Sequence, residues 1–197
     1  MKLRQIKKIL KKVWHFLVHE ESWASFLADA IIIILVAKFV VYPAIGLALG
    51  TSYPLVAVVS SSMDHGGQDF ENWWSSYGDW YEQHNISDER FQNYYLNNGF
   101  KKGDVLVIKG APIADLRAGD TIIYKVTGKK DPIIHRIIAI NISDSEIAIS
   151  TKGDANSGQL EFEKSVLPDQ IRGKGVALIP KIGWFKVAFI ELFKKLK

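Results

Sequence analysis

The stretch PIIHRIIAINISDSEIAIST, residues 132–151, carries two apolar runs separated by a short polar break around Ser143–Ser145. Branched apolar residues favour extended backbone, whereas Ser, Asp and Asn favour turns. The pattern therefore predicts two antiparallel strands joined by a short turn.

Similar runs lie on both sides of this hairpin, each bounded by Gly, Asp, Asn or Pro. They are DVLVIKG (104–110), DTIIYKV (120–126) and GKGVALI (173–179). Together the runs predict a mainly β domain over residues 51–180. The chain has no cysteine, which excludes disulfides, thiol catalysis and Cys-ligated metals.

Residues 64–100 differ from these surroundings because aromatic residues recur there at helical spacing. The residues in that register are Phe70, Trp73, Trp74, Tyr77, Trp80 and Tyr81. Ser87 is suited to cap a second short helix. The segment thus reads as a helical insertion in the β domain. Two interpretations stay open: it seats or covers a cleft at the membrane surface, or it buries a small core of its own.

Before the β domain, residues 30–49 (AIIIILVAKFVVYPAIGLAL) form an apolar run with one charge, Lys38. A bilayer core needs roughly 20 helical residues, so the run predicts a transmembrane helix, placed at residues 23–50. A mid-span ammonium costs on the order of 3 kcal/mol, which snorkelling and the surrounding apolar residues offset. A buried core helix and a cleaved secretory signal are the alternatives. The signal fits less well, because the charged region before the run is too long and no small-x-small site closes it.

Basic residues gather at both ends of the chain. Six of the first 12 residues are Lys or Arg, and residues 1–22 read as a basic amphipathic segment. The net charge is +4, and these basic residues stand beside apolar ones, which favours a membrane surface over nucleic acid as the binding partner. The positive-inside rule puts the N-terminus in the cytoplasm and the β domain outside. Residues 181–197 predict an amphipathic helix too short to span, lying at the interface or packed on the domain.

The segment VVSSSM, residues 58–63, supplies a candidate nucleophile in Ser62. From Leu49 to Ser62 the chain extends at most about 45 Å, so Ser62 acts near the outer membrane surface. A serine hydroxyl needs a neighbouring base, and imidazole is suited to exchange a proton near neutral pH. His135, in the first strand of the hairpin, is the candidate base.

A carboxylate on the second ring nitrogen would orient that base. A turn at Ser143–Asp144 or at Asp144–Ser145 places Asp154, in TKGDAN, on the same strand face as His135. A one-residue slip would put the two on opposite faces. The backbone N–H of Ser62 and the hydroxyl of Ser60 are the candidate oxyanion donors.

The order of these motifs resembles the archaeal and endoplasmic-reticulum-type type I signal peptidases, in which the base is a histidine. The matching residues are Ser62-Met63, Gly119-Asp120, His135-Arg136, Lys152-Gly153-Asp154 and Asn156, within residues 30–180 outside the insertion. The resemblance implies a β fold attached by an N-terminal span. It also implies Ser62 as nucleophile, His135 as base, and cleavage of signal peptides after small residues.

Two positions depart from the family pattern. A proline usual two positions after the methionine is replaced by His65, which makes His65 a remote alternative base. A second aspartate, six residues after the one in the KGD motif, is replaced by Leu160. Asp154 is therefore the expected acidic partner, with Glu161 as runner-up.

The sequence thus predicts a single-pass peptidase of the cell membrane that acts on signal-bearing preproteins. Catalytic residues are Ser62, His135 and Asp154, with no cofactor or metal. Membrane lipid and the translocation machinery are further expected partners. The alternatives are a membrane-tethered, non-catalytic binding or assembly domain and, third, a self-cleaving relative.

Overall fold

The computed structural model describes residues 2–20, 22–143, 147–184, 186–188 and 192. Two compact units divide the chain, residues 1–48 and residues 49–197. The helices are α1 (Lys2–His19), α2 (Trp23–Val36), π-helical η1 (Ala37–Val41), α3 (Tyr42–Leu49), α4 (Phe70–Glu82), α5 (Asp88–Gln92), η2 (Ile113–Asp115), α6 (Glu161–Lys164) and η3 (Pro168–Gln170). The strands are β1 (Leu55–Ala57), β2 (Val105–Lys109), β3 (Thr121–Tyr124), β4 (Ile133–Ile142), β5 (Ile147–Lys152) and β6 (Ile171–Ile179).

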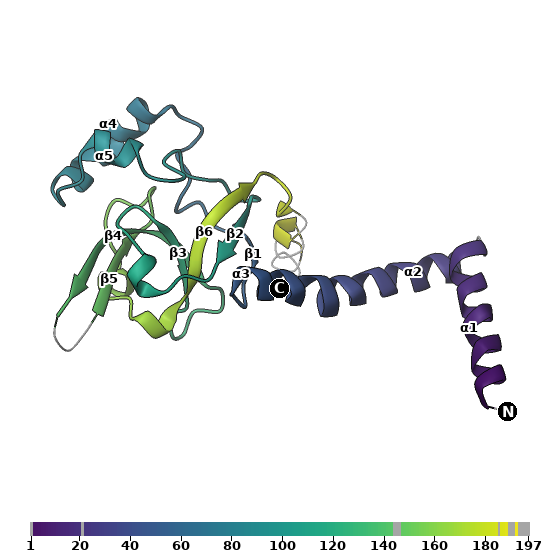
Figure 1. The fold of residues 1–197 in the computed structure, drawn as a ribbon. Coiled ribbons are helices and arrows are strands. Elements are labelled where there is room, and N and C mark those ends of the chain that lie inside the picture. Colours follow the sequence, from purple (N-terminus) through teal and green to yellow (C-terminus); the bar gives the residue numbers. More distant parts are fainter. Residues whose placement is uncertain (1, 21, 144–146, 185, 189–191, 193–197) are drawn as a thin grey trace. The chain divides into compact units, whose positions relative to one another are not determined.

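The N-terminal unit consists of two helical stretches. Ser22 caps α2 by accepting a hydrogen bond from the Ser25 backbone N–H at 3.1 Å, and α1 turns away from α2 at this cap (Figure 1). Helices α2, η1 and α3 run continuously over Trp23–Leu49, a helix long and apolar enough to cross a membrane. Its most apolar window has a mean hydropathy of 2.4 and no buried residue. The predicted apolar helix is thus confirmed, and Lys38 lies in its π-helical turn.

The second unit is built on one antiparallel sheet. Among the described residues, its six strands follow the order β1-β2-β6-β3-β4-β5. The strands expected from the sequence are present, and β1 is an addition that pairs with β2 through Val56 and Leu106. The mainly β fold with a helical insertion is confirmed. Asp144 and Ser145 of the turn expected around Ser143–Ser145 lie outside the described residues, as do residues 185, 189–191 and 193–197 of the helix expected over 181–197.

Two apolar clusters fill the sheet domain. One joins β1, β2 and the segment after β1, and its buried members are Val56, Val58, Met63, Phe100, Leu106, Ile108 and Ile123. The other lies between β3, β4, β5 and α6, and its buried members are Leu116, Ile122, Tyr124, Ile137, Ile149 and Val166. Burial of a large apolar side chain contributes about 1.5–3 kcal/mol, so these clusters fix where the strand ends and loops lie.

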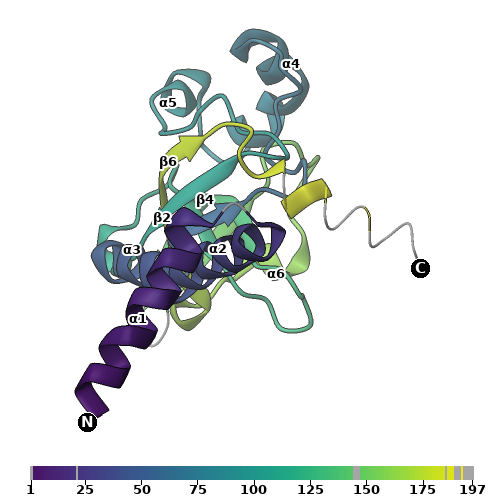
Figure 2. The same cartoon turned by 90° about the vertical axis from the view of Figure 1, so that its right-hand side faces the viewer.

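The insertion over residues 64–100 has its own core. Helices α4 and α5 lie on the same side of the sheet in two perpendicular views (Figures 1 and 2). Trp73, Tyr81, Ile86 and Phe91 are buried together with Ile138 of β4. The insertion therefore packs its aromatics inward and onto the sheet, in line with the second interpretation. Ser87 caps α5 as expected, by accepting a hydrogen bond from the Arg90 backbone N–H at 3.3 Å.

Candidate active site

Ser62 lies in the segment that leaves β1. Val58 and Met63, on either side of the serines, are buried in the first cluster, and the Phe100 backbone N–H donates to the Met63 carbonyl at 2.9 Å. Ser62 itself is partly exposed. The apolar anchors hold the loop, while the hydroxyl between them faces open space.

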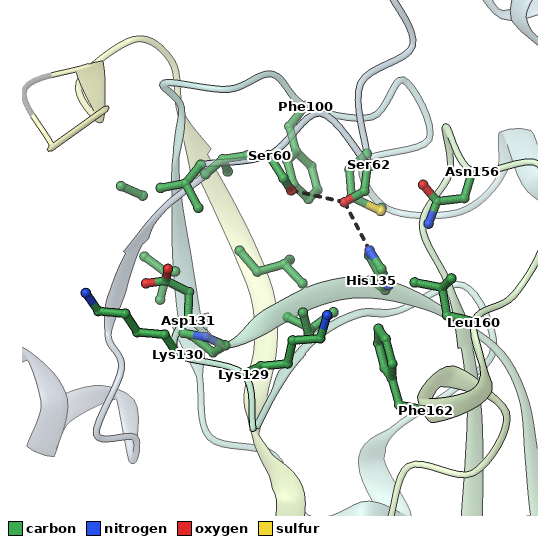
Figure 3. Close-up of a pocket in the computed structure, with 18 of the residues that line it drawn as sticks. Ser60, Ser62, Phe100, Lys129, Lys130, Asp131, His135, Asn156, Leu160 and Phe162 are labelled. Atoms are coloured by element: carbon green, nitrogen blue, oxygen red, sulfur yellow. Dashed lines mark hydrogen bonds between the residues drawn. The ribbon is translucent and has the colours of Figure 1, made fainter. Parts of the chain in front are cut away.

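His135 comes from β4, where it lies opposite Ile122 of β3. Its Nε2 lies 3.0 Å from Ser62 Oγ, within hydrogen-bonding distance (Figure 3). His135 is only 4% exposed, so most of the ring is shielded from bulk solvent. The sheet thus brings together two residues that the sequence separates widely, at a distance suited to proton transfer.

Glu163, the third residue of α6, contacts the other ring nitrogen. Its Oε1 pairs with His135 Nδ1, and its Oε2 accepts a hydrogen bond from the Leu160 backbone N–H at 2.5 Å. The Glu163 side chain is fully buried. A carboxylate at Nδ1 can accept a hydrogen bond from an Nδ1–H tautomer, whose Nε2 could then accept a proton from Ser62 Oγ.

The expectation that Asp154 lies beside His135 is wrong. Ile142 lies opposite Ile147, the register expected from a turn at Asp144–Ser145, but a bulge at Ile138 shifts the pairing by one residue. Arg136 consequently lies opposite Lys152, and Asp154 falls on the face of Arg136. The runner-up Glu161 is also away from the imidazole: it is exposed and pairs with Lys164 at 2.5 Å.

Asp154 is instead the centre of a buried polar cluster. Arg136 donates to its two oxygens from Nε at 3.0 Å and from an outer nitrogen at 2.6 Å. The Tyr81 hydroxyl donates at 3.1 Å, and His65 Nε2 lies 3.1 Å away. Burial alone would raise the pKa of Asp154, but Arg136 and the hydrogen bonds from His65 and Arg136 hold it well below the usual range. Asp154 therefore stays ionised near neutral pH.

His65 does not contact Ser62 through its ring. The Nε2 of His65 is directed to Asp154, and the ring stacks on Trp73 with centroids 3.8 Å apart and an interplanar angle of 2°. The structure thus places the alternative base candidate in the buried cluster and not at the hydroxyl.

The Ser60 side chain lies beside Ser62. Its Oγ is 3.2 Å from Ser62 Oγ, and both hydroxyls face the same opening (Figure 3). Asn156 lies on the other side of Ser62 in the same view. A hydroxyl at this distance from Ser62 Oγ would be in reach of an oxyanion formed on a carbon that Ser62 attacked.

Ser62 and His135 line a cavity of about 440 Å³. Apolar side chains from the β1 segment, from the start of β4 and from the α6 region line it, and charged residues of the 129–131 turn lie at its edge. Representative lining residues are Val56, Val58, Phe100, Ile134, Leu160 and Phe162. A cavity lined mainly by apolar side chains, with a few polar groups, suits a ligand with apolar groups.

Gly153, the middle residue of the KGD motif, lies against both His135 and Ser62. A Cβ at this position would lie 2.8 Å from His135 Nε2 and 2.9 Å from the Ser62 carbonyl oxygen. Only glycine allows such a close approach of this backbone to both groups.

No protein-family model matches the chain. It is similar to the signal peptidase complex catalytic subunit SEC11 of Colletotrichum graminicola, with 31% identity over 49% of this chain and 59% of the relative. It is also similar to the human signal peptidase complex catalytic subunit SEC11C, with 32% identity over 45% of this chain and 49% of the relative. The chain thus spans between about half and three fifths of the length of these relatives.

A longer but weaker match extends over most of the chain. The SEC11 subunit of Scheffersomyces stipitis is 21% identical over 79% of this chain and 76% of its own length. The homologues confirm the resemblance to the endoplasmic-reticulum-type, Ser-His type I signal peptidases that the motifs indicate.

Proposed function

We propose that the chain is a membrane-bound serine endopeptidase that removes signal peptides from preproteins at the outer membrane surface. One observation supports this above the others: Ser62 Oγ, the His135 imidazole and the buried Glu163 carboxylate are in consecutive contact beside an apolar cavity. A serine and a histidine with only structural roles would not need a hydroxyl at one ring nitrogen and a buried carboxylate at the other.

In the first step, Ser62 Oγ attacks the scissile carbonyl carbon while His135 Nε2 takes the hydroxyl proton. Glu163, at Nδ1, stabilises the imidazolium that results. The Ser60 hydroxyl and the Ser62 backbone N–H are the proposed donors to the developing oxyanion. His135 then returns the proton to the leaving amine, and an acyl-enzyme remains on Ser62.

In the second step, His135 takes a proton from water, and the hydroxide attacks the acyl carbon. The proton passes to Ser62 Oγ as the acyl bond breaks, so the free enzyme is restored. Each proton moves through one imidazole nitrogen, which explains why the other nitrogen is held by a fixed carboxylate.

The proposed substrates are preproteins, with the residues before the cleavage point in the apolar cavity. The helix Trp23–Leu49 supplies the membrane attachment, and the basic residues of α1 favour an N-terminus in the cytoplasm. The relatives are named as subunits of a complex, so partner subunits at the cell membrane, together with lipid and the translocation machinery, belong to the proposal.

The test uses the purified full chain in detergent and a precursor whose signal peptide ends in Ala-x-Ala. We expect one cut after the second alanine, and covalent labelling of Ser62 by a serine-directed fluorophosphonate, located by mass spectrometry. A membrane-tethered binding domain would leave the precursor intact and Ser62 unlabelled, and a self-cleaving relative would instead release its own β domain.

Gly153→Ala is expected to lower kcat by roughly 10- to 100-fold, because the added Cβ pushes the Ser62 backbone and the His135 ring apart. The readout is precursor cleavage together with thermal unfolding. Gly158→Ala is the matched control, since its Cβ would meet only Trp80 Nε1 at an ordinary 3.8 Å. Equal activity of the two variants would contradict the proposed closeness of Gly153 to the dyad.

A further inference from the structure

The aromatic insertion contacts the loop that carries the KGD motif, and not only its own core. Lys152 Nζ lies 4.6 Å from the ring centre of Tyr81 and 5.0 Å from that of Trp80. Burial lowers the pKa of Lys152 to about 8, although Asp154 opposes the shift. Cation–π contacts with these rings stabilise the position of the ammonium group, so helix α4 holds the end of β5 in place.

Asp154, two residues after Lys152 in the same loop, receives two contacts from the insertion. The Tyr81 hydroxyl donates to Oδ1, and His65 Nε2 lies 3.1 Å from Oδ2. His65 is itself fixed, because it is 4% exposed and stacked on Trp73 of α4. The position of Asp154 is therefore determined from the insertion side as well as by Arg136.

The same loop holds the nucleophile. The Ala155 backbone N–H donates to the Ser62 carbonyl at 2.8 Å, and the Asp154 N–H contacts Met63 Sδ at 3.4 Å. The two segments are thus joined at two points. Ser62 accepts a hydrogen bond from the Ala155 N–H, and His65, three residues after Ser62, contacts Asp154, the residue before Ala155. A shift of Asp154 would move the peptide group that fixes Ser62.

We propose that His65 and Tyr81 are positioning residues, through which the insertion over residues 64–100 holds the loop 153–156 and thereby aligns Ser62 with His135. This inference rests on the proposed peptidase function. His65 acts through Asp154 and exchanges no proton with the substrate. A loop displaced by about 1 Å lowers the rate on the order of 10²-fold without weakening substrate binding.

The test compares His65→Phe, which keeps a ring to stack on Trp73 but loses the N–H, with His65→Gln, which keeps a donor that reaches Asp154. We expect kcat to fall roughly 10- to 50-fold in His65→Phe with KM within about twofold, and to recover in part in His65→Gln. Tyr81→Phe should lower kcat about fivefold. Tyr95→Phe is the control, because its hydroxyl donates to the Val176 carbonyl, away from Asp154.

A second readout does not depend on cleavage: hydrogen exchange of the Ala155 amide, whose partner is the Ser62 carbonyl. We expect exchange at Ala155 to rise about tenfold in His65→Phe and to stay unchanged in Tyr95→Phe. Wild-type levels of both kcat and Ala155 protection in His65→Phe would overturn the inference. A folded wild type that cleaves no precursor would overturn the proposed function instead, and faster Ala155 exchange in His65→Phe would still support the positioning role.

Discussion

Ser62→Ala is expected to lower the rate of precursor cleavage by about 10⁴-fold or more, because no other hydroxyl lies 3.0 Å from His135 Nε2 among the described residues. The variant loses only the hydrogen bonds of one partly exposed hydroxyl, so the free energy of unfolding should change by about 1 kcal/mol or less. Single-turnover cleavage with excess enzyme measures the first effect, and thermal unfolding measures the second.

Ser61→Ala is the matched control, since it removes the neighbouring exposed serine without touching the His135 ring. We expect it to cleave at nearly the wild-type rate. Ser62→Ala with full activity would remove the basis of the peptidase proposal, and the same loss in both variants would point to damage of the loop and not to loss of the nucleophile.

The long, regular parts of the fold could be predicted from the sequence. The runs around residues 104–110, 120–126, 132–151 and 173–179 carry both apolar pattern and turn residues, and they became β2, β3, β4, β5 and β6. Strand β1, only Leu55–Ala57, was not predicted. Its three residues continue the apolar linker, and only pairing with β2 makes them a strand.

The site was predictable in part, and the limits have local causes. Short motifs identified Ser62 and His135 as a pair, and the 3.0 Å contact agrees with that pairing. The acidic partner depended on strand register, which a bulge at Ile138 changed by one residue. Glu163 stands on a helix of four residues, too short to leave a periodic signal.

The packing of the insertion shows a second limit of sequence reasoning. The spacing of the aromatic residues predicted helices, and the structure has α4 and α5 there. The spacing does not show which of these side chains also contact residues of the sheet domain. That Tyr81 reaches Asp154 and that Trp80 covers Lys152 follow only from how the insertion packs on the sheet.

Glu163→Gln is expected to lower kcat on the order of 10²- to 10⁴-fold with little change in KM, because the neutral amide no longer stabilises the imidazolium formed in the transition state. The amide also has one acceptor oxygen for two donors, His135 Nδ1–H and the Leu160 N–H. One of these contacts is lost, and the ring is then free to turn or change tautomer. Precursor cleavage over a range of substrate concentrations separates kcat from KM.

Two carboxylates of the same region serve as controls with different expected defects. Glu161→Gln removes an exposed charge and should retain activity. Asp154→Asn leaves the buried Arg136 without its anion. The free energy of unfolding should therefore fall by about 3–5 kcal/mol, and Tm by about 10 °C. If Asp154→Asn lost kcat at unchanged Tm while Glu163→Gln stayed fully active, the acidic partner of His135 would be Asp154 after all, and the assignment from the His135–Glu163 contact would have to be abandoned.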